Sequence, residues 1–242
     1  MKTILGMWAH PDDEVFVSGG LMADAVRRGD RVVCVHMTRG EAGLSYRKKC
    51  PPETLGELRQ RELEGSLERL GVAEQRFFGY PDGRLALVPR GEAIVRLHDL
   101  LAEVRPDVVL TFGSDGYTGH PDHKSLSAWV TAAVRLWNKP KTRLFQAEVS
   151  SEWKKSFVPR LNEFDFFWPG YPITSARSDI ALKLDDELLD IKVEALRAHA
   201  SQMQPLFDAY GDEFMRAVAA TEHFRLGPKA AFRSRVLLDL AR

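Results

Sequence analysis

Histidines and carboxylates gather in two short stretches of this chain, roughly a hundred residues apart. The first is AHPDDE at residues 9–14, directly after a short apolar run, and the second is GHPDH at residues 119–123. Charged groups cost free energy when they are buried, unless they are paired or bind a cation. One histidine and three carboxylates within five residues therefore predict a metal site, which the second stretch is expected to complete.

The residue types suit a catalytic zinc site, which needs three protein ligands and an open position for water. His10 and Asp13 are close enough in sequence for one turn to aim both at the same ion, and His123 completes a His/Asp/His set. Asp12 then lies beside the metal, where it can take a proton from a water whose pKa the ion lowers to roughly 7. Iron(II) could occupy the same ligands.

The second stretch offers groups that need not be metal ligands. His120 as an imidazolium could stabilise an oxyanion or protonate a leaving amine, and Asp122 could orient a neighbouring ring. Tyr117 lies in the same loop and is a candidate oxyanion donor. Asp115 is a candidate for substrate contact, with an Asx-turn as the alternative role.

Strand-like and helix-like patterns alternate along the chain. Strands are expected at residues 3–9, 31–38, 77–78, 107–112 and 143–149, and helices at 15–28, 52–70, 94–104, 125–137, 186–202 and near 212–220. This order predicts an α/β fold with a mostly parallel sheet and helices on both faces. No GxGxxG follows the first strand, so no dinucleotide cofactor is expected.

In open α/β sheets the active site lies at the carboxyl ends of the strands. Three expected loops leave such ends, at residues 10–14, 39–52 and 113–123, and two of them carry the clusters. In the middle loop, Arg39 and Arg47 are candidates for substrate contact by position.

Five short motifs together resemble the PIG-L/LmbE-like superfamily of zinc-dependent N-deacetylases. They are AHPDDE at 9–14, TRGEAG at 38–43, PDG at 81–83, GHPDH at 119–123 and HASQ at 199–202. The resemblance implies a Rossmann-like fold and hydrolysis of an acetamido group, usually on an N-acetylglucosamine unit. It also implies zinc on His10, Asp13 and His123, Asp12 as the general base, and His120 as charge stabiliser and acid.

The remaining titratable residues of interest have structural interpretations. His36, His98 and His223 belong to no cluster and are expected to be structural, and His199 is more readily a satisfied histidine on an amphipathic helix. Glu14 either stabilises the start of a helix or supports the metal site.

Residues 151–178 are rich in aromatics and prolines and show no clean period. We expect them to form an ordered insertion in a single domain that spans residues 1–242. Their aromatics at 164–168 favour packing or an interface over a sugar platform.

Composition narrows the choice of partners and compartment. Lys plus Arg equals Asp plus Glu at 34 each, so the chain has no net positive charge that would attract nucleic acid. Two cysteines suit a reducing compartment, and no apolar run is long enough to span a membrane, so a cytoplasmic protein is expected. A homo-oligomer is left open.

The predicted function is therefore removal of acetate from a small-molecule amino-sugar conjugate. An amidase of the same family that cleaves a larger acyl group would have the same metal site. A non-haem iron oxygenase uses two histidines and one carboxylate as well, although usually on an all-β scaffold. A sugar-binding protein without catalysis is the third alternative.

Overall fold

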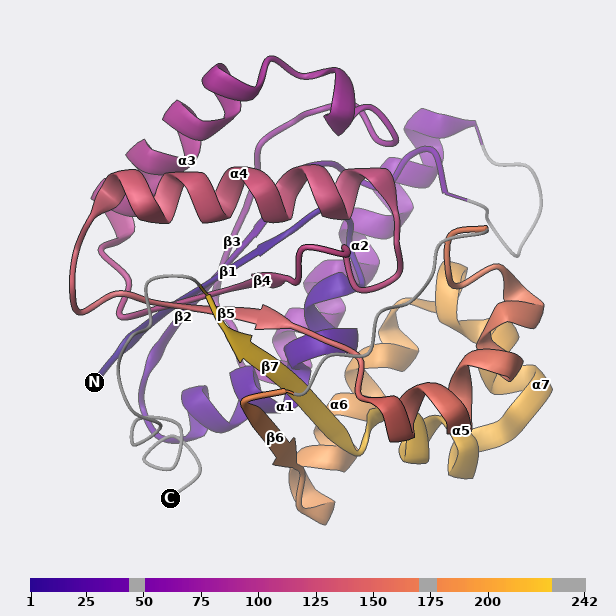
Figure 1. Cartoon of the computed structure of the whole chain (residues 1–242). Coiled ribbons are helices and arrows are strands. Elements are labelled where there is room, and N and C mark those ends of the chain that lie inside the picture. Colours follow the sequence, from indigo (N-terminus) through magenta and orange to yellow (C-terminus); the bar gives the residue numbers. More distant parts are fainter. Residues whose placement is uncertain (44–50, 170–177, 228–242) are drawn as a thin grey trace.

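The computed structural model describes residues 1–43, 51–169 and 178–227. Its centre is a seven-stranded sheet in the order β3-β2-β1-β4-β5-β7-β6 (Figure 1). The strands are β1 Thr3–Trp8, β2 Arg31–His36, β3 Glu74–Phe77, β4 Val108–Phe112, β5 Arg143–Ala147, β6 Ile180–Lys183 and β7 Thr221–Leu226. The first five are parallel, whereas β7 runs antiparallel to both β5 and β6.

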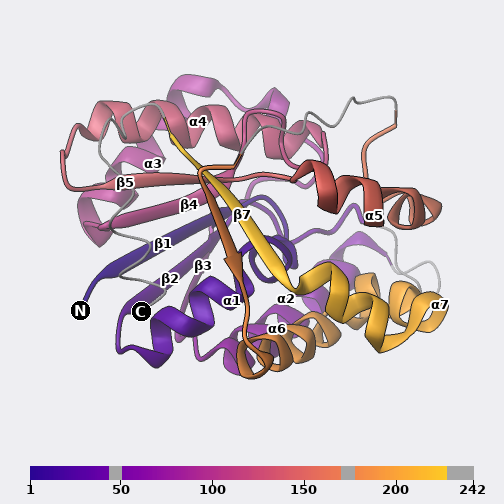
Figure 2. The same cartoon turned by 60° about the horizontal axis from the view of Figure 1, so that its bottom comes forward.

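Helices cover both faces of the sheet. They are α1 Asp13–Arg27, α2 Pro52–Leu70, α3 Arg90–Val104, α4 Pro121–Trp137, α5 Ser151–Leu161, α6 Asp186–Ala198 and α7 Ala200–Ala219, with short 3-10 turns η1 Leu85–Leu87 and η2 Asn162–Phe164. Figure 2 shows α3 and α4 on one face and α1, α2 and α6 on the other, with α5 and α7 beyond the end of the strands. The predicted α/β fold class is confirmed.

The middle strands are buried on both faces, as parallel strands between two helix layers must be. Every residue of β4 is buried, and in β1 only Thr3 is partly exposed. Trp8 and Phe112, at the carboxyl ends of these two strands, pack edge to face with ring centroids 5.4 Å apart. This packing fixes the point at which the two cluster-bearing loops leave the sheet.

Strand β1 pairs with β2 on one side and with β4 on the other. The chain moves outward from β1 through β2 to β3, and returns to the other side of β1 at β4. Ligands of open α/β sheets bind at this kind of reversal, because the loops on either side of it diverge. Residues 9–14 and 113–123 leave β1 and β4 here, so the fold brings the two clusters together.

The second half of the chain departs from expectation in three places. The predicted helix 186–202 is divided at His199, whose φ of −81° and ψ of 50° end α6 and begin α7. Strands β6 and β7 were not predicted, because both are antiparallel strands with partly exposed residues and no clear apolar pattern, and β6 lies at the edge of the sheet. The segment 151–178 contains helix α5, which Ser150 caps by accepting from the N–H of Trp153.

Within the described ranges, none of the helices has both the length and the apolar character needed to cross a bilayer.

Candidate metal centre

His10, Asp13 and His123 meet at the edge of the sheet between β1 and β4. The Nδ1 atom of His10 lies 3.1 Å from Nε2 of His123 and 3.6 Å from Oδ2 of Asp13. The other oxygen of Asp13 lies 3.3 Å from the same His123 nitrogen. All three side chains are buried. Two imidazole nitrogens and one carboxylate therefore face a common point, as the predicted ligand set requires.

The hydrogen bonds of His123 determine which of its nitrogens is free. Its Nδ1 atom lies 3.0 Å from the carbonyl oxygen of Gly116 and 3.2 Å from Oγ1 of Thr118. A carbonyl can only accept, so Nδ1 carries the proton and Nε2 presents its lone pair to the centre. Gly116 has φ of 76°, and a Cβ there would lie 3.1 Å from the Cβ of His123. A glycine at this position lets the loop close on the ring.

His10 is oriented from its far side by two carboxylates. Its Nε2 atom lies 2.9 Å from Oδ1 of Asp82 and 3.4 Å from Oδ2 of Asp122. A proton on Nε2 leaves Nδ1 free to face Asp13 and His123. Burial lowers the pKa of His10, but Asp122, Asp13 and Asp82 outweigh it and raise that pKa well above its usual value. Three carboxylates thus act on the His10 ring.

These observations fit a divalent cation. The donors are two imidazole nitrogens and a carboxylate, which zinc and iron(II) both accept. Burial opposes ionisation of Asp13, yet His123 and His10 hold its pKa down at about 2, so it is a carboxylate at neutral pH. A nitrogen atom of His120 also lies within 4.8 Å of ligand atoms of His10 and His123.

Asp82 and Asp122 also tie the surrounding loops together. Asp122 accepts from the backbone N–H of Gly83 at 2.9 Å and of Leu85 at 3.1 Å, and Asp82 accepts from that of Ala42 at 2.8 Å. Asp122 thus contacts the ring that needs orienting, as its predicted role requires. Asp82 was not among the predicted site residues, and its place within the PDG motif was the available signal.

Asp12 has a strained backbone, with φ of 104° and ψ of −28°. Such a conformation in a residue other than glycine costs about 1–3 kcal/mol and is concentrated at functional sites. Arg59 of α2 holds this turn, donating to Oδ2 of Asp12 at 2.9 Å and to the carbonyl oxygen of Pro11 at 2.6 Å. It also donates to the carbonyl oxygen of Gly40 at 2.9 Å.

The surroundings of Asp12 give its carboxyl group the pKa of a usable base. Burial raises that pKa to about 6, against the opposing effect of Arg59 and with a further upward contribution from Asp13. A general base works best when its pKa is near the working pH. Arg59 was missed by sequence reasoning, although it lies four residues from Leu55 and from Leu63, on the apolar face of the helix. A charged residue on the apolar face of a helix was the available indication that Arg59 has a buried partner.

His120 is the N-cap of α4, and its Nδ1 accepts from the N–H of Asp122 at 3.1 Å. Its proton therefore lies on Nε2. Burial, with His10 and His123 nearby, lowers the pKa of His120 to about 4. The ring is thus a neutral hydrogen-bond donor near pH 7, rather than the imidazolium expected from the sequence. Trp168 packs edge to face against it at 4.9 Å and is 46% exposed.

The predicted substrate residues lie in three different environments. Arg39 is exposed, with its guanidinium 5.7 Å from the ring centre of Phe77. Asp115 accepts from the N–H of Tyr117 at 3.0 Å, which is an Asx-turn. The ring of Tyr117 is buried beside Phe16, a packing environment rather than a position among the histidines. Arg47 lies outside the described residues.

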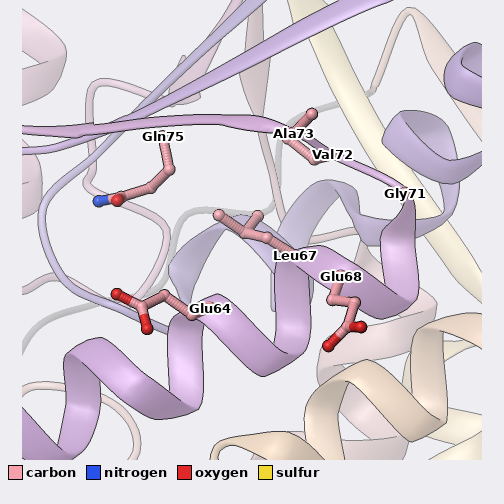
Figure 3. Close-up of a pocket in the computed structure, with 7 residues that line it drawn as sticks. All are labelled: Glu64, Leu67, Glu68, Gly71, Val72, Ala73 and Gln75. Atoms are coloured by element: carbon pink, nitrogen blue, oxygen red, sulfur yellow. The ribbon is translucent and has the colours of Figure 1, made fainter.

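A separate hollow lies between the end of α2 and β3 (Figure 3). Its lining residues are Glu64, Leu67, Glu68, Gly71, Val72, Ala73 and Gln75. The lining has neither a histidine nor a lysine or arginine, and it includes none of the clustered residues.

This chain is similar in sequence to proteins named as deacetylases. The chain is 30% identical over 221 residues to the 1D-myo-inositol 2-acetamido-2-deoxy-alpha-D-glucopyranoside deacetylase of Corynebacterium glutamicum (strain R), with 83% of this chain and 74% of that protein covered.

Two solved structures have the same fold. One is the N,N'-diacetylchitobiose deacetylase from Pyrococcus horikoshii, with a TM-score of 0.67, 23% identity, and 99% of this chain and 88% of that chain covered. The other is GalB, the 4-carboxy-2-hydroxymuconate hydratase from Pseudomonas putida KT2440. Its TM-score is 0.65 at 20% identity, and 97% of this chain and 98% of that chain are covered. At these identities the likenesses show the fold and not the reaction.

The family follows from the sequence match. The PIG-L family model, described as GlcNAc-PI de-N-acetylase, matches residues 5–134, which is more than half of the 242 residues and contains both clusters. This chain belongs to the PIG-L family.

Proposed function

We propose that this protein is a metal-dependent hydrolase that removes the acetyl group from an N-acetylated amino sugar. The observation that carries the proposal is the convergence of His10, Asp13 and His123 on one point, with Asp12 beside them. Zinc is the proposed metal, and iron(II) is the alternative at the same ligands.

The proposed reaction adds water to the acetamide carbonyl and then breaks its C–N bond. A bound zinc ion would supply a water of lowered pKa and a positive charge near the carbonyl oxygen. Asp12 accepts a proton from the attacking water, since its pKa of about 6 leaves it mostly ionised at neutral pH. The Nε2–H of His120 donates a hydrogen bond to the oxygen that becomes negative. The proton on Asp12 is then available to the departing amine.

Other residues keep these groups in place. Asp82 and Asp122 orient His10, whereas Arg59 holds the carboxylate of Asp12. A misplacement of about 1 Å in such a site can reduce the rate on the order of a hundredfold, so these contacts matter to the rate.

The proposed substrate class is a small-molecule conjugate of N-acetylglucosamine type. The names of the Corynebacterium and Pyrococcus relatives both specify acetylated amino sugars. At the rim of the site, Trp168 presents an exposed aromatic ring beside His120, and Arg39 is exposed on the loop after β2. Such groups suit the non-reacting part of a sugar conjugate.

A screen for acetate release tests this proposal. Purified protein is incubated with a series of N-acetylglucosamine conjugates and with matched N-butanoyl conjugates, with and without a chelator. Acetate release that the chelator abolishes is the expected result. Preferential hydrolysis of the longer acyl group would indicate the related amidase, and oxygen uptake without acetate would indicate an iron oxygenase. Binding of the conjugates without turnover would indicate a sugar-binding protein.

A further inference from the structure

Glu14 lies at the centre of a buried polar cluster that the reaction does not use directly. Its side chain and those of His36 and His199 are fully buried. Oε2 of Glu14 lies 3.1 Å from Nε2 of His36, and Oε1 lies 3.1 Å from Nε2 of His199. Ser66 adds a longer contact of 3.4 Å to Oε1. We refer to Glu14, His36 and His199 as the Glu14 clamp.

The members of the clamp come from distant parts of the chain. Glu14 is in the first turn of α1, His36 ends β2, and His199 is the residue at which α6 stops and α7 starts. The helix break at His199 was absent from the sequence-based expectation, and it delivers this ring to Glu14 across 185 positions. Helix α1, the junction of α6 with α7, and strand β2 thus meet on one carboxylate.

The clamp acts on the backbone of Asp12. The N–H of Asp12 donates to Oε2 of Glu14 at 2.9 Å, and Asp12 is the residue with φ of 104°. Asp12 is also the N-cap of α1, but its side chain makes no capping hydrogen bond. In a capping box, a glutamate inside the first turn reaches back to the N–H of the N-cap residue. Glu14, at the second helical position rather than the third, makes the equivalent contact, so the carboxylate of Asp12 is not used to cap the helix.

The histidines fix the direction of the Glu14 side chain. Each directs Nε2 at the carboxylate, and within the described ranges the Nδ1 atom of neither has a hydrogen-bond partner. A carboxylate between two such donors has one favourable orientation, with Oε2 toward the N–H of Asp12. Rotation of Glu14 would leave that N–H and at least one imidazole without a partner in a buried site, which is unfavourable.

We propose that Glu14, held by His36 and His199, is a positioning residue that keeps the strained backbone of Asp12 in the conformation that catalysis requires. This inference rests on the proposed function, because it takes Asp12 as the general base. It assigns His36 and His199 an effect on turnover, beyond the structural role that the sequence suggested for them.

The test compares variants that keep or remove the acceptor. Glu14→Gln keeps an oxygen toward Asp12, and a neutral His199 can move its proton to Nδ1 and accept from the new amide. Glu14→Met has a similar length and no such acceptor. His199→Phe removes one of the two donors, and His98→Phe is the matched control on α3, where His98 lies 3.5 Å from Asp99. The readouts are kcat and KM for acetate release, metal per chain, melting temperature and the φ angle of Asp12 in metal-free crystals.

The expected result is a kcat lowered by about tenfold or more in Glu14→Met and His199→Phe, with KM and metal content unchanged. Glu14→Gln and the His98→Phe control are expected to stay within about threefold of the wild type. In metal-free Glu14→Met crystals the φ of Asp12 should leave the left-handed region.

Three outcomes would overturn the inference. Glu14→Met could fold, bind metal and keep its kcat, or Asp12 could keep its φ angle in that variant. Alternatively, kcat could fall as far in Glu14→Gln as in Glu14→Met, and the fall in both variants could match a loss of bound metal. Failure of the proposed function is distinguishable, because in that case the wild type itself releases no acetate while the φ comparison still reports on the clamp.

Discussion

Two adjacent aspartates differ in pKa because their surroundings differ. Asp13 faces His123 and His10, which hold its pKa at about 2, whereas burial raises the pKa of Asp12 to about 6. Neighbouring groups whose pKa values are pushed apart in this way are typical of paired catalytic roles. Asp13 is accordingly the permanent anion that suits a metal ligand, and Asp12 is the group that can take and release a proton.

Substitutions of these residues should separate catalysis from metal binding. Asp12→Ala is expected to retain metal and to lose about 10²–10⁴-fold in kcat, which is the usual contribution of a general base. His10→Ala and His123→Ala are expected to lose the metal itself, because each removes a ligand. Metal per chain and acetate release are measured on the same samples, with Asp99→Ala at an exposed site as the control. Near-normal turnover in Asp12→Ala would exclude it as the base.

Arg59 should influence the pH dependence of the reaction. It lowers the pKa of Asp12, so its removal raises that pKa. Because the base must be deprotonated, the acidic limb of kcat/KM should move to higher pH in Arg59→Met, and activity should fall more at pH 6 than at pH 8. Arg59→Lys keeps the charge and is expected to shift less. An acidic limb that stays in place or moves to lower pH in Arg59→Met would contradict the role given to Arg59.

At the residue scale, the sequence was most informative where chemistry and spacing coincide. The proximity of His10, Asp13 and His123 could be expected, because two clusters of rare composition follow two strands. Arg59 was not singled out, and its position on the apolar face of α2 is the one feature of the sequence that distinguishes it from the solvated arginines of that helix. Its partner Asp12 is 47 positions away, and only the packing of α2 against the loop reveals the contact.

At the scale of elements, the aromatic segment after α5 packs in two directions. Phe166 and Phe167 pack inward, against Phe16 and Trp153 respectively, as the sequence favoured. Trp168 instead lies against His120, and its backbone N–H donates to the carbonyl oxygen of Thr118 at 2.8 Å. The segment thus contacts the loop that carries the second cluster through one backbone hydrogen bond and one ring contact.

Trp168 should therefore affect substrate affinity more than chemistry. Trp168→Ala is expected to raise KM about twofold to tenfold for a sugar conjugate, because a ring packed on an aromatic side chain contributes on the order of 1 kcal/mol. The effect on kcat should be smaller. Phe164→Ala is the matched control, since Phe164 is 40% exposed on the same segment but contacts Tyr210. Equal changes in the two variants would show that the segment acts only through stability.

The elements that could be predicted are those with a strong period or a clear end. Helix α2 begins at Pro52 and ends at Leu70, as expected from Pro at its first turn and Gly71 after its last, where φ is 72°. Strands β6 and β7 could not be predicted, because their stability comes from pairing with β5 and with each other and not from a local pattern. The same holds for the break at His199, which the buried contact with Glu14 explains.

At the scale of the whole molecule, the fold places the site and the side chains define the reaction. The sheet order puts the loops after β1 and β4 side by side, and this holds for a hydratase with the same fold as well as for deacetylases. Folds of this kind support several chemistries. The claim of deacetylation therefore depends on the metal centre and on Asp12.

The most direct measurement is acetate release as a function of bound metal. Metal-free protein is titrated with zinc, and in parallel with iron(II) under anaerobic conditions, on a conjugate identified by the screen. We expect no release without metal, and a rate that rises in proportion to bound metal until the single proposed site at His10, Asp13 and His123 is filled. Full activity in protein shown to be metal-free would contradict it.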